Sequence, residues 1–252
     1  MQRLSDTPIP TYLVDSQEFA NELLADEITT LLTEQAGRLV LGLATGNSPI
    51  GLYNELARRF REDWIDLSFV QTFNLDEYIG LATDHPASYR AFMAEHLFER
   101  TNLGPRHVHF PPSGAKDMDA ACSRWEETIR TVGGIDWQLL GIGRNGHIGF
   151  NEPGSPFDSR TRRIELTEST RTANARFFED PEDVPHQAVT MGIGTILEAK
   201  RLRVLAFGET KAQILERVLR GEDDPSIPLN ALRRHPDAAL YIDAKAAARL
   251  GQ

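Results

Sequence analysis

Residues 136–154, DWQLLGIGRNGHIGFNEPG, join a short apolar run to a loop that is rich in glycine. The run at 137–142 does not alternate polar and apolar residues, which is typical of a strand buried on both faces of a parallel sheet. Fixing a glycine-rich loop costs conformational entropy. The polar residues His147 and Glu152 in this loop therefore indicate a functional role and not merely a solvent-exposed loop.

Three other apolar runs resemble this one, at residues 39–43, 69–73 and 202–207. Helical patterns alternate with the runs, at residues 16–35, 49–61, 87–100, 117–132 and 210–219. Alternating strands and helices predict an α/β fold with a mostly parallel open sheet and helices on both faces. The proline-rich loops are too short to be linkers, so we expect a single domain over residues 1–252.

The composition limits the classes of partner and the compartment. Apolar residues make up 40% of the chain, which is enough for a sizeable core, and the net charge of −10 argues against nucleic-acid binding. An anionic ligand would need a local cationic pocket. The lone cysteine, Cys122, excludes an intramolecular disulfide, and we expect a cytoplasmic protein. Neither a secretory signal nor a membrane span is predicted.

Loops that follow parallel strands converge at one edge of the sheet, where ligands bind. After the first run come Thr45, Gly46, Asn47 and Ser48, followed by an amphipathic helix. We predict that Ser48 is the N-cap and that Pro49 is the first helical residue, so that backbone N–H groups face a phosphate. A plain strand-to-helix turn would use the same residues, because the spacing matches neither common phosphate-loop motif.

Acidic and basic residues occupy the other three loops. We expect Asp76 to enter the crevice and interpret its neighbour Glu77 as a cap or a solvated charge. His147 and Glu152 form a candidate pair, although a hydrogen-bonded loop histidine and an exposed carboxylate remain the alternative. Lys211 opens a helix, where its charge opposes the helix dipole unless an anion or water lies beside it.

A further cation could come from Arg171 or Arg176, since arginine suits bidentate phosphate contact. Together the four loops suit proton transfer on a phosphorylated small molecule. The other histidines are scattered without the spacing of metal ligands, and we expect no metal site.

These residues closely resemble the glucosamine-6-phosphate deaminase family. The matching stretches run in consistent order from residue 41 to residue 212: LGLATGNSPIGLY, FNLDEYIGL, HPASYRAFM, GIGRNGHIGFNEPG, SRTR, TRTANARFF, AVTMGIGTIL and FGETKA. The resemblance implies a modified, Rossmann-like, doubly wound sheet. It also implies conversion of glucosamine 6-phosphate to fructose 6-phosphate with loss of ammonia, without metal or cofactor.

The resemblance assigns roles to individual residues. Asp76 matches the base that moves a proton between C2 and C1, His147 the group that assists ring opening, and Glu152 its acidic partner. The family's phosphate contacts correspond to Thr45, Gly46, Asn47, Ser48, Arg176 and Lys211.

Two departures from the family pattern matter. Asn145 stands where many members have Asp, and it can accept a hydrogen bond from the His147 ring but cannot stabilise an imidazolium by charge. Allosteric members bind N-acetylglucosamine 6-phosphate through positions that include Ser155, Arg162 and a lysine that is Ile164 here, and the ending KAAARLGQ lacks a comparable tail. We therefore predict a non-allosteric enzyme that is a monomer or a small homo-oligomer.

Two alternatives remain open. A 6-phosphogluconolactonase shares the fold and the ligand class but hydrolyses a lactone, and FNLDEY and NGHIGFNEP favour deamination over it. The sugar-phosphate sensor domain of a repressor should carry a helix-turn-helix segment, which the acidic N-terminal part does not offer.

Overall fold

The computed structural model describes residues 1–251, which contain a large and a small β-sheet. The large sheet has eight strands in the order β1-β2-β11-β10-β7-β3-β4-β6. Every neighbouring pair is parallel except β1 and β2. In that spatial order the bounds are Gln2–Arg3, Thr11–Leu13, Ala238–Ile242, Leu202–Ala206, Trp137–Gly141, Val40–Leu43, Gln71–Asn74 and Val108–His109.

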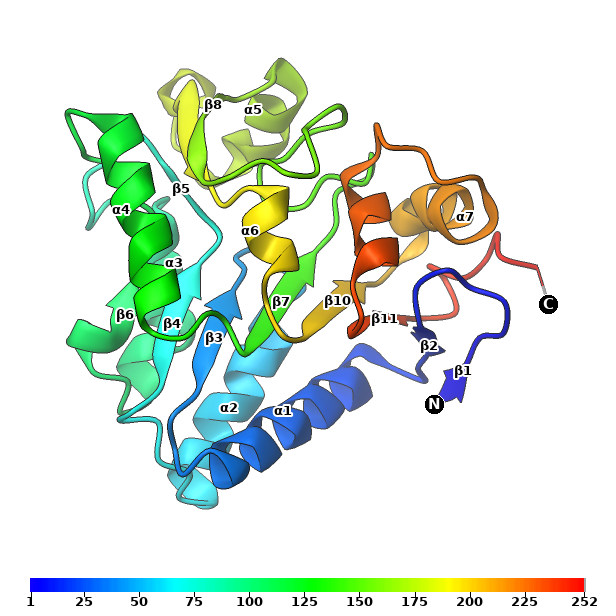
Figure 1. The fold of residues 1–252 in the computed structure, drawn as a ribbon. Coiled ribbons are helices and arrows are strands. Elements are labelled where there is room, and N and C mark those ends of the chain that lie inside the picture. Colours follow the sequence, from blue (N-terminus) through cyan, green and yellow to red (C-terminus); the bar gives the residue numbers. More distant parts are fainter. Residues whose placement is uncertain (252) are drawn as a thin grey trace.

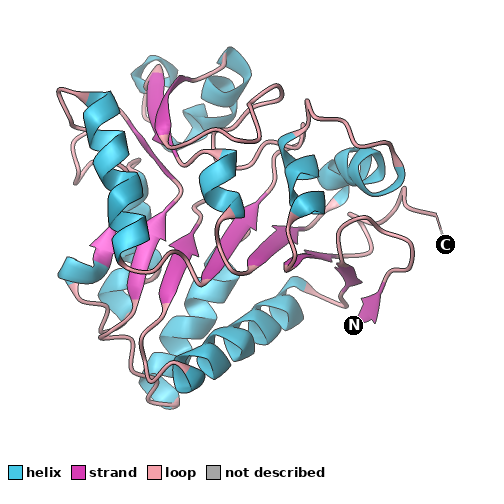
Figure 2. Ribbon diagram, viewed as in Figure 1, coloured by secondary structure: helices cyan, strands magenta, loops and turns pink. Residues whose placement is uncertain are grey.

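Helices cover both faces of the large sheet (Figures 1 and 2). One buried cluster joins the sheet to α1 (Gln17–Glu34), α2 (Ile50–Glu62) and α3 (Tyr89–His96). The opposite cluster joins it to α4 (Met118–Thr131), α6 (Ile193–Leu197), α7 (Ala212–Arg220) and the 3-10 helix η6 (Pro228–Arg234). The predicted doubly wound α/β class is confirmed.

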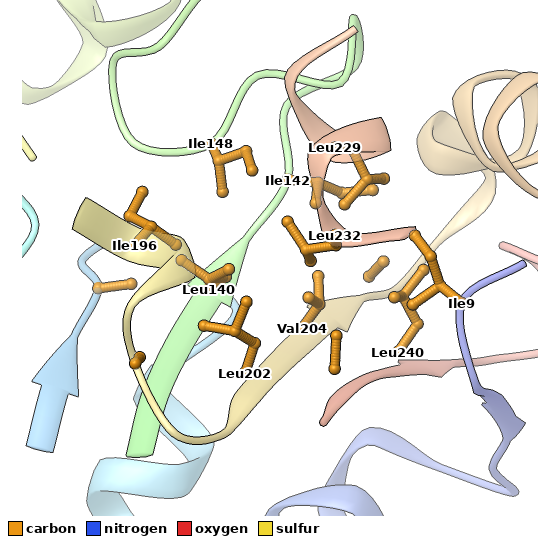
Figure 3. Close-up of a cluster of buried hydrophobic side chains, with 14 of the residues drawn as sticks. Ile9, Leu140, Ile142, Ile148, Ile196, Leu202, Val204, Leu229, Leu232 and Leu240 are labelled. Atoms are coloured by element: carbon orange, nitrogen blue, oxygen red, sulfur yellow. The ribbon is translucent and has the colours of Figure 1, made fainter. Parts of the chain in front are cut away.

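Figure 3 shows how the second cluster is built from alternate strand positions. Leu140, Val204 and Leu240 come from three adjacent parallel strands, and their side chains meet Ile196 of α6 and Leu232 of η6. All five are at most 1% exposed. Burial of this many aliphatic side chains holds the strands in register and so fixes the edge where the loops emerge.

The small sheet lies beyond the carboxyl edge of the large one, at the top of Figure 1. It is antiparallel, in the order β5-β9-β8, with bounds Asp76–Tyr78, Gln187–Thr190 and Arg162–Glu165. Between β8 and β9 the chain forms α5 (Glu168–Asn174) and the 3-10 helices η3 (Ala175–Phe177) and η4 (Pro181–Asp183). The sequence patterns predicted the parallel sheet but not this second one.

Two predicted boundaries are wrong. The strand expected at 69–73 begins at Gln71, because Val70 N–H closes a turn onto Leu67 and leaves the Phe69 side chain 64% exposed. The helix expected at 87–100 breaks at Leu97 into α3 and a short 3-10 helix, η1 (Phe98–Arg100). Within residues 1–251, no helix combines the length and the apolar character needed to traverse a bilayer.

Candidate active site

The four candidate loops follow four adjacent strands. β10, β7, β3 and β4 are neighbours and run in the same direction, so the loops that follow them emerge side by side. The strand order reverses between β3 and β7, since β4 and β6 extend to one side while β10 and β11 extend to the other. Such a reversal opens a crevice at the carboxyl ends of the two central strands, which is where open α/β sheets bind ligands.

The loop after β3 presents backbone N–H groups at this reversal. Gly46 has φ +99°, a conformation that favours glycine. Within residues 1–251, the N–H groups of residues 45–48 donate to no protein acceptor. The loop is anchored from outside by Gln17, whose Nε2 donates to the Ser48 carbonyl at 3.0 Å. Unpaired N–H groups at a helix start suit an anion.

Ser48 is not the N-cap that the sequence predicted. Pro49 takes that place, since its carbonyl accepts the first helical bond from Tyr53 N–H and α2 starts at Ile50. No side chain caps the helix. The Ser48 hydroxyl is therefore not committed to α2.

Asp76 begins β5, with a single residue between it and the end of β4. Its side chain is 6% exposed, and burial, followed by the charge of Glu77, raises the pKa of Asp76 to about 8. A Cβ at Gly149 would lie 3.2 Å from Asp76 Oδ2. The Asp76 carboxylate thus lies directly against the loop that carries His147.

Glu77 points to the start of α3 instead. Its carboxylate accepts hydrogen bonds from the backbone N–H groups of Tyr78, Tyr89 and Arg90, at 2.8–3.1 Å. The side chain is buried, and burial raises its pKa although these three donors oppose the shift. Of the two interpretations offered, the cap is right and the solvated charge is wrong.

His147 and Glu152 face each other across the loop after β7. Gly143 N–H donates to the His147 carbonyl, and the imidazole folds over Gly143, where any side chain would collide with it. His147 Nδ1 lies 3.7 Å from Glu152 Oε2. This nitrogen is shielded from solvent and has no hydrogen-bond partner among residues 1–251, and Glu152 is the carboxylate within 4 Å of it there.

Asn145 bonds differently from the prediction. It accepts from the His147 backbone N–H at 3.2 Å, not from the ring, while its Nδ2 donates to Glu152 Oε2 at 2.8 Å. His147, together with hydrogen bonds from Thr170 and Asn145, lowers the pKa of Glu152 to about 2. Glu152 is therefore a fixed negative charge beside the imidazole.

The three candidate cations differ in their surroundings, and Arg171 donates its Nε to the Val184 carbonyl at 3.3 Å. Lys211 is the last residue of the 3-10 helix η5 (Glu209–Lys211), and its Nζ donates to the Ile142 carbonyl at 2.7 Å, at the end of β7. Burial and nearby Arg144 lower the pKa of Lys211, and no carboxylate lies within 4 Å of it in residues 1–251. Arg176 is exposed on η3 and stacks over Phe177, making no ion pair in the described chain.

Sequence reasoning missed two hydroxyls that hold the site. Thr170 Oγ1 donates to Glu152 Oε1 at 2.5 Å, and Thr190 Oγ1 accepts from Phe150 N–H at 3.1 Å. Both residues lie inside matched stretches, TRTANARFF and AVTMGIGTIL, but nothing in their spacing indicates a partner in the β7 loop. In residues 1–251, no group of three or more His, Cys, Asp or Glu side chains is arranged to hold a metal ion.

The fold and the site define a class: α/β proteins in which a buried carboxylate, a histidine and glutamate pair and a loop with free backbone N–H groups follow adjacent parallel strands. A family model described as glucosamine-6-phosphate isomerases/6-phosphogluconolactonase matches residues 15–241. This chain belongs to that family, and the resemblance noted in the sequence motifs is confirmed.

Relatives with established names cover most of the chain. Glucosamine-6-phosphate deaminase 2 of Bacillus subtilis (strain 168) is 50% identical over 213 residues, 84% of this chain and 86% of its own. Glucosamine-6-phosphate deaminase of Thermoanaerobacter pseudethanolicus (strain ATCC 33223 / 39E) is 45% identical over 223 residues, 88% of each chain.

Solved structures agree with the fold. The structure of a monomeric glucosamine-6-phosphate deaminase superposes with a TM-score of 0.91 at 40% identity, covering 95% of this chain and 99% of its own. A 6-phosphogluconolactonase from Thermotoga maritima has a TM-score of 0.72 at 20% identity, covering 92% and 98%. The second likeness concerns the fold alone.

Proposed function

We propose that this protein converts D-glucosamine 6-phosphate into D-fructose 6-phosphate and ammonia, with the residues of this crevice as its catalytic groups. The observation that carries the assignment of the base is the buried Asp76 carboxylate against Gly149, in the loop of the His147 and Glu152 pair. A lactone hydrolase needs no base for a carbon-bound proton. An aldose-to-ketose conversion does need one.

The sugar phosphate would bind by its charged end. The N–H groups of residues 45–48 supply neutral donors, half-buried Lys211 supplies a cation that makes no ion pair within residues 1–251, and Arg176 supplies a guanidinium from the segment above. A phosphate beside Lys211 would restore a favourable partner for its charge. Binding one end in this way leaves C1 and C2 toward Asp76 and His147.

Ring opening is the role proposed for His147. The imidazole takes the proton of the C1 hydroxyl and delivers a proton to the ring oxygen, which breaks the C1–O5 bond and frees the aldehyde. The resulting imidazolium lies 3.7 Å from ionised Glu152, and opposite charges at this distance attract.

Asp76 then acts on the open chain. Its carboxylate removes the C2 proton while a proton of the ammonium group passes to the C1 oxygen, which gives a neutral enolamine. The protonated carboxyl then returns its proton to C1, which leaves an iminium at C2 and restores the carboxylate. Water adds to the iminium carbon and passes a proton to the nitrogen, and the C–N bond breaks as the ketone forms, releasing ammonia and one proton. A base with a pKa of about 8 is well matched to neutral pH, and the substrate's ammonium group would favour its ionised form.

The test is a stoichiometric product assay. Purified protein is given glucosamine 6-phosphate, and ammonia and ketose phosphate are measured together, with 6-phosphogluconolactone supplied in a parallel reaction. The proposal predicts one ammonia for each ketose and no lactone hydrolysis above background. Lactone hydrolysis without ammonia release would instead support the gluconolactonase alternative.

We further propose that the enzyme acts in amino-sugar catabolism in the cytoplasm, as a monomer or a small homo-oligomer. The monomeric deaminase with a TM-score of 0.91 supports the low oligomeric state, and light scattering of the purified protein measures it.

A further inference from the structure

Glu152 is held by donors that come from two different parts of the chain. Asn145, in its own loop, donates to Oε2, the same oxygen that faces His147. Thr170, on α5, donates to the other oxygen, Oε1. No described ionic group other than His147 lies within 4 Å of this carboxylate. The two oxygens therefore have different partners, because Thr170 binds Oε1 while Oε2 faces Asn145 and the imidazole.

The direction of the Thr170 hydroxyl is fixed by its neighbour. Thr167, the N-cap of α5, accepts from Thr170 N–H at 3.2 Å and donates its own hydroxyl hydrogen to Thr170 Oγ1 at 3.0 Å. Since Thr170 Oγ1 already accepts one hydrogen bond, its single hydrogen is available for the carboxylate. A hydroxyl oriented in this way favours ionised Glu152 over the protonated acid.

This contact is not needed to start α5. Thr167 supplies the capping oxygen, and none of the residues of α5 is buried. The segment that follows α5 carries Arg176, six residues beyond Thr170. The hydrogen bond between Thr170 and Glu152 thus links the loop after β7 to the segment that carries a candidate phosphate ligand.

We propose that Thr170 is a positioning residue for the reaction, whose hydroxyl holds Glu152 Oε1 so that Oε2 faces His147 when the α5 segment is in place. As far as it concerns catalysis, this inference rests on the proposed function. Thr170 touches neither the substrate nor the reacting atoms in this account. It acts through Glu152.

The kinetic test compares Thr170→Val, which keeps the shape and removes the hydroxyl, with Thr170→Ser, which keeps the hydroxyl. We expect Thr170→Val to lower kcat/KM for ammonia release about tenfold to a hundredfold, the range typical of a hydrogen bond to a charged group. The acid limb of the pH–rate profile of Thr170→Val should move to higher pH. Thr170→Ser should restore both kcat/KM and the position of this limb. Thr172→Val makes the same change at an exposed threonine of α5 and is the control, which should leave both unchanged.

A second measurement does not depend on turnover. The Glu152 side-chain carboxyl is titrated by NMR in the wild type and in Thr170→Val, and its midpoint should rise by about one unit or more. An unchanged midpoint, or a Thr170→Ser variant as impaired as Thr170→Val, overturns the inference. If the wild type released no ammonia, the proposed function would fail, while the titration would still decide the role of Thr170.

Discussion

Replacing Asp76 by asparagine should stabilise the folded protein, by an amount that grows with pH. The Asp76 side chain is 6% exposed, and burial raises its pKa from 3.8 to about 8. The folded-state pKa therefore lies above the unfolded one. Between about pH 4 and pH 8 the folded protein holds a proton here that the unfolded chain has lost, so wild-type stability falls as pH rises through this window.

The size of the effect follows from the shift. One extra proton in the folded state corresponds to a slope of about 1.4 kcal/mol per pH unit. Over about four units the upper value is about 6 kcal/mol, a large fraction of the stability of a typical domain. Asparagine keeps the shape without the charge, and its amide adds a cost of about 1–3 kcal/mol that does not vary with pH. The dependence of the free-energy difference on pH, and not its absolute value, therefore reports the Asp76 ionisation.

The assay is urea unfolding of the wild type and Asp76→Asn at intervals from pH 5 to pH 9. The difference in unfolding free energy should move in favour of the variant up to about pH 8 and then level. Asp84→Asn, which changes an exposed carboxylate, is the matched control and should remain within about 0.5 kcal/mol of the wild type. A pH-independent difference for Asp76→Asn would refute the argument that burial raises this pKa.

Three further predictions concern the other loops. Asn145→Asp exchanges the donor to Glu152 for a second carboxylate, so the pKa of Glu152 should rise and the acid limb of the pH–rate profile should move upward. An unchanged pH–rate profile would show that Asn145 does not influence the ionisation that controls the acid limb. Lys211→Met should raise KM for the sugar phosphate and weaken inhibition by inorganic phosphate at least about tenfold, as expected for a lost charged contact, whereas exposed Lys245→Met should not. Initial rates should be hyperbolic in substrate and insensitive to N-acetylglucosamine 6-phosphate, because Ile164 replaces a cation of allosteric members; sigmoidal rates relieved by that compound would contradict this.

The convergence of the four loops was predictable from the sequence because it follows from chain direction. Buried runs at residues 39–43, 137–142 and 202–207 became parallel neighbours, and loops after parallel strands must emerge at one edge. The polar and charged residues of these loops could then be assigned to one site without coordinates. The period of the apolar residues and the order of the elements are enough to predict this convergence.

Local hydrogen bonding was not predictable in the same way. Whether Asn145 meets the ring of His147 or its backbone depends on dihedral angles within a glycine loop, which the spacing of residues does not determine. The bond from Thr170 to Glu152 joins residues 18 apart through the position of α5. The small antiparallel sheet was not predicted because β5 is three residues long and only one residue separates it from β4.

The most direct test of the central claim, that the Asp76 carboxylate moves the proton from C2 to C1, is turnover by Asp76→Asn. Ammonia release is measured at saturating glucosamine 6-phosphate beside the wild type, after NMR has shown that the variant is folded. We predict a loss of about a hundredfold to ten-thousandfold in kcat, the contribution of a positioned general base. Release at the wild-type rate would contradict it.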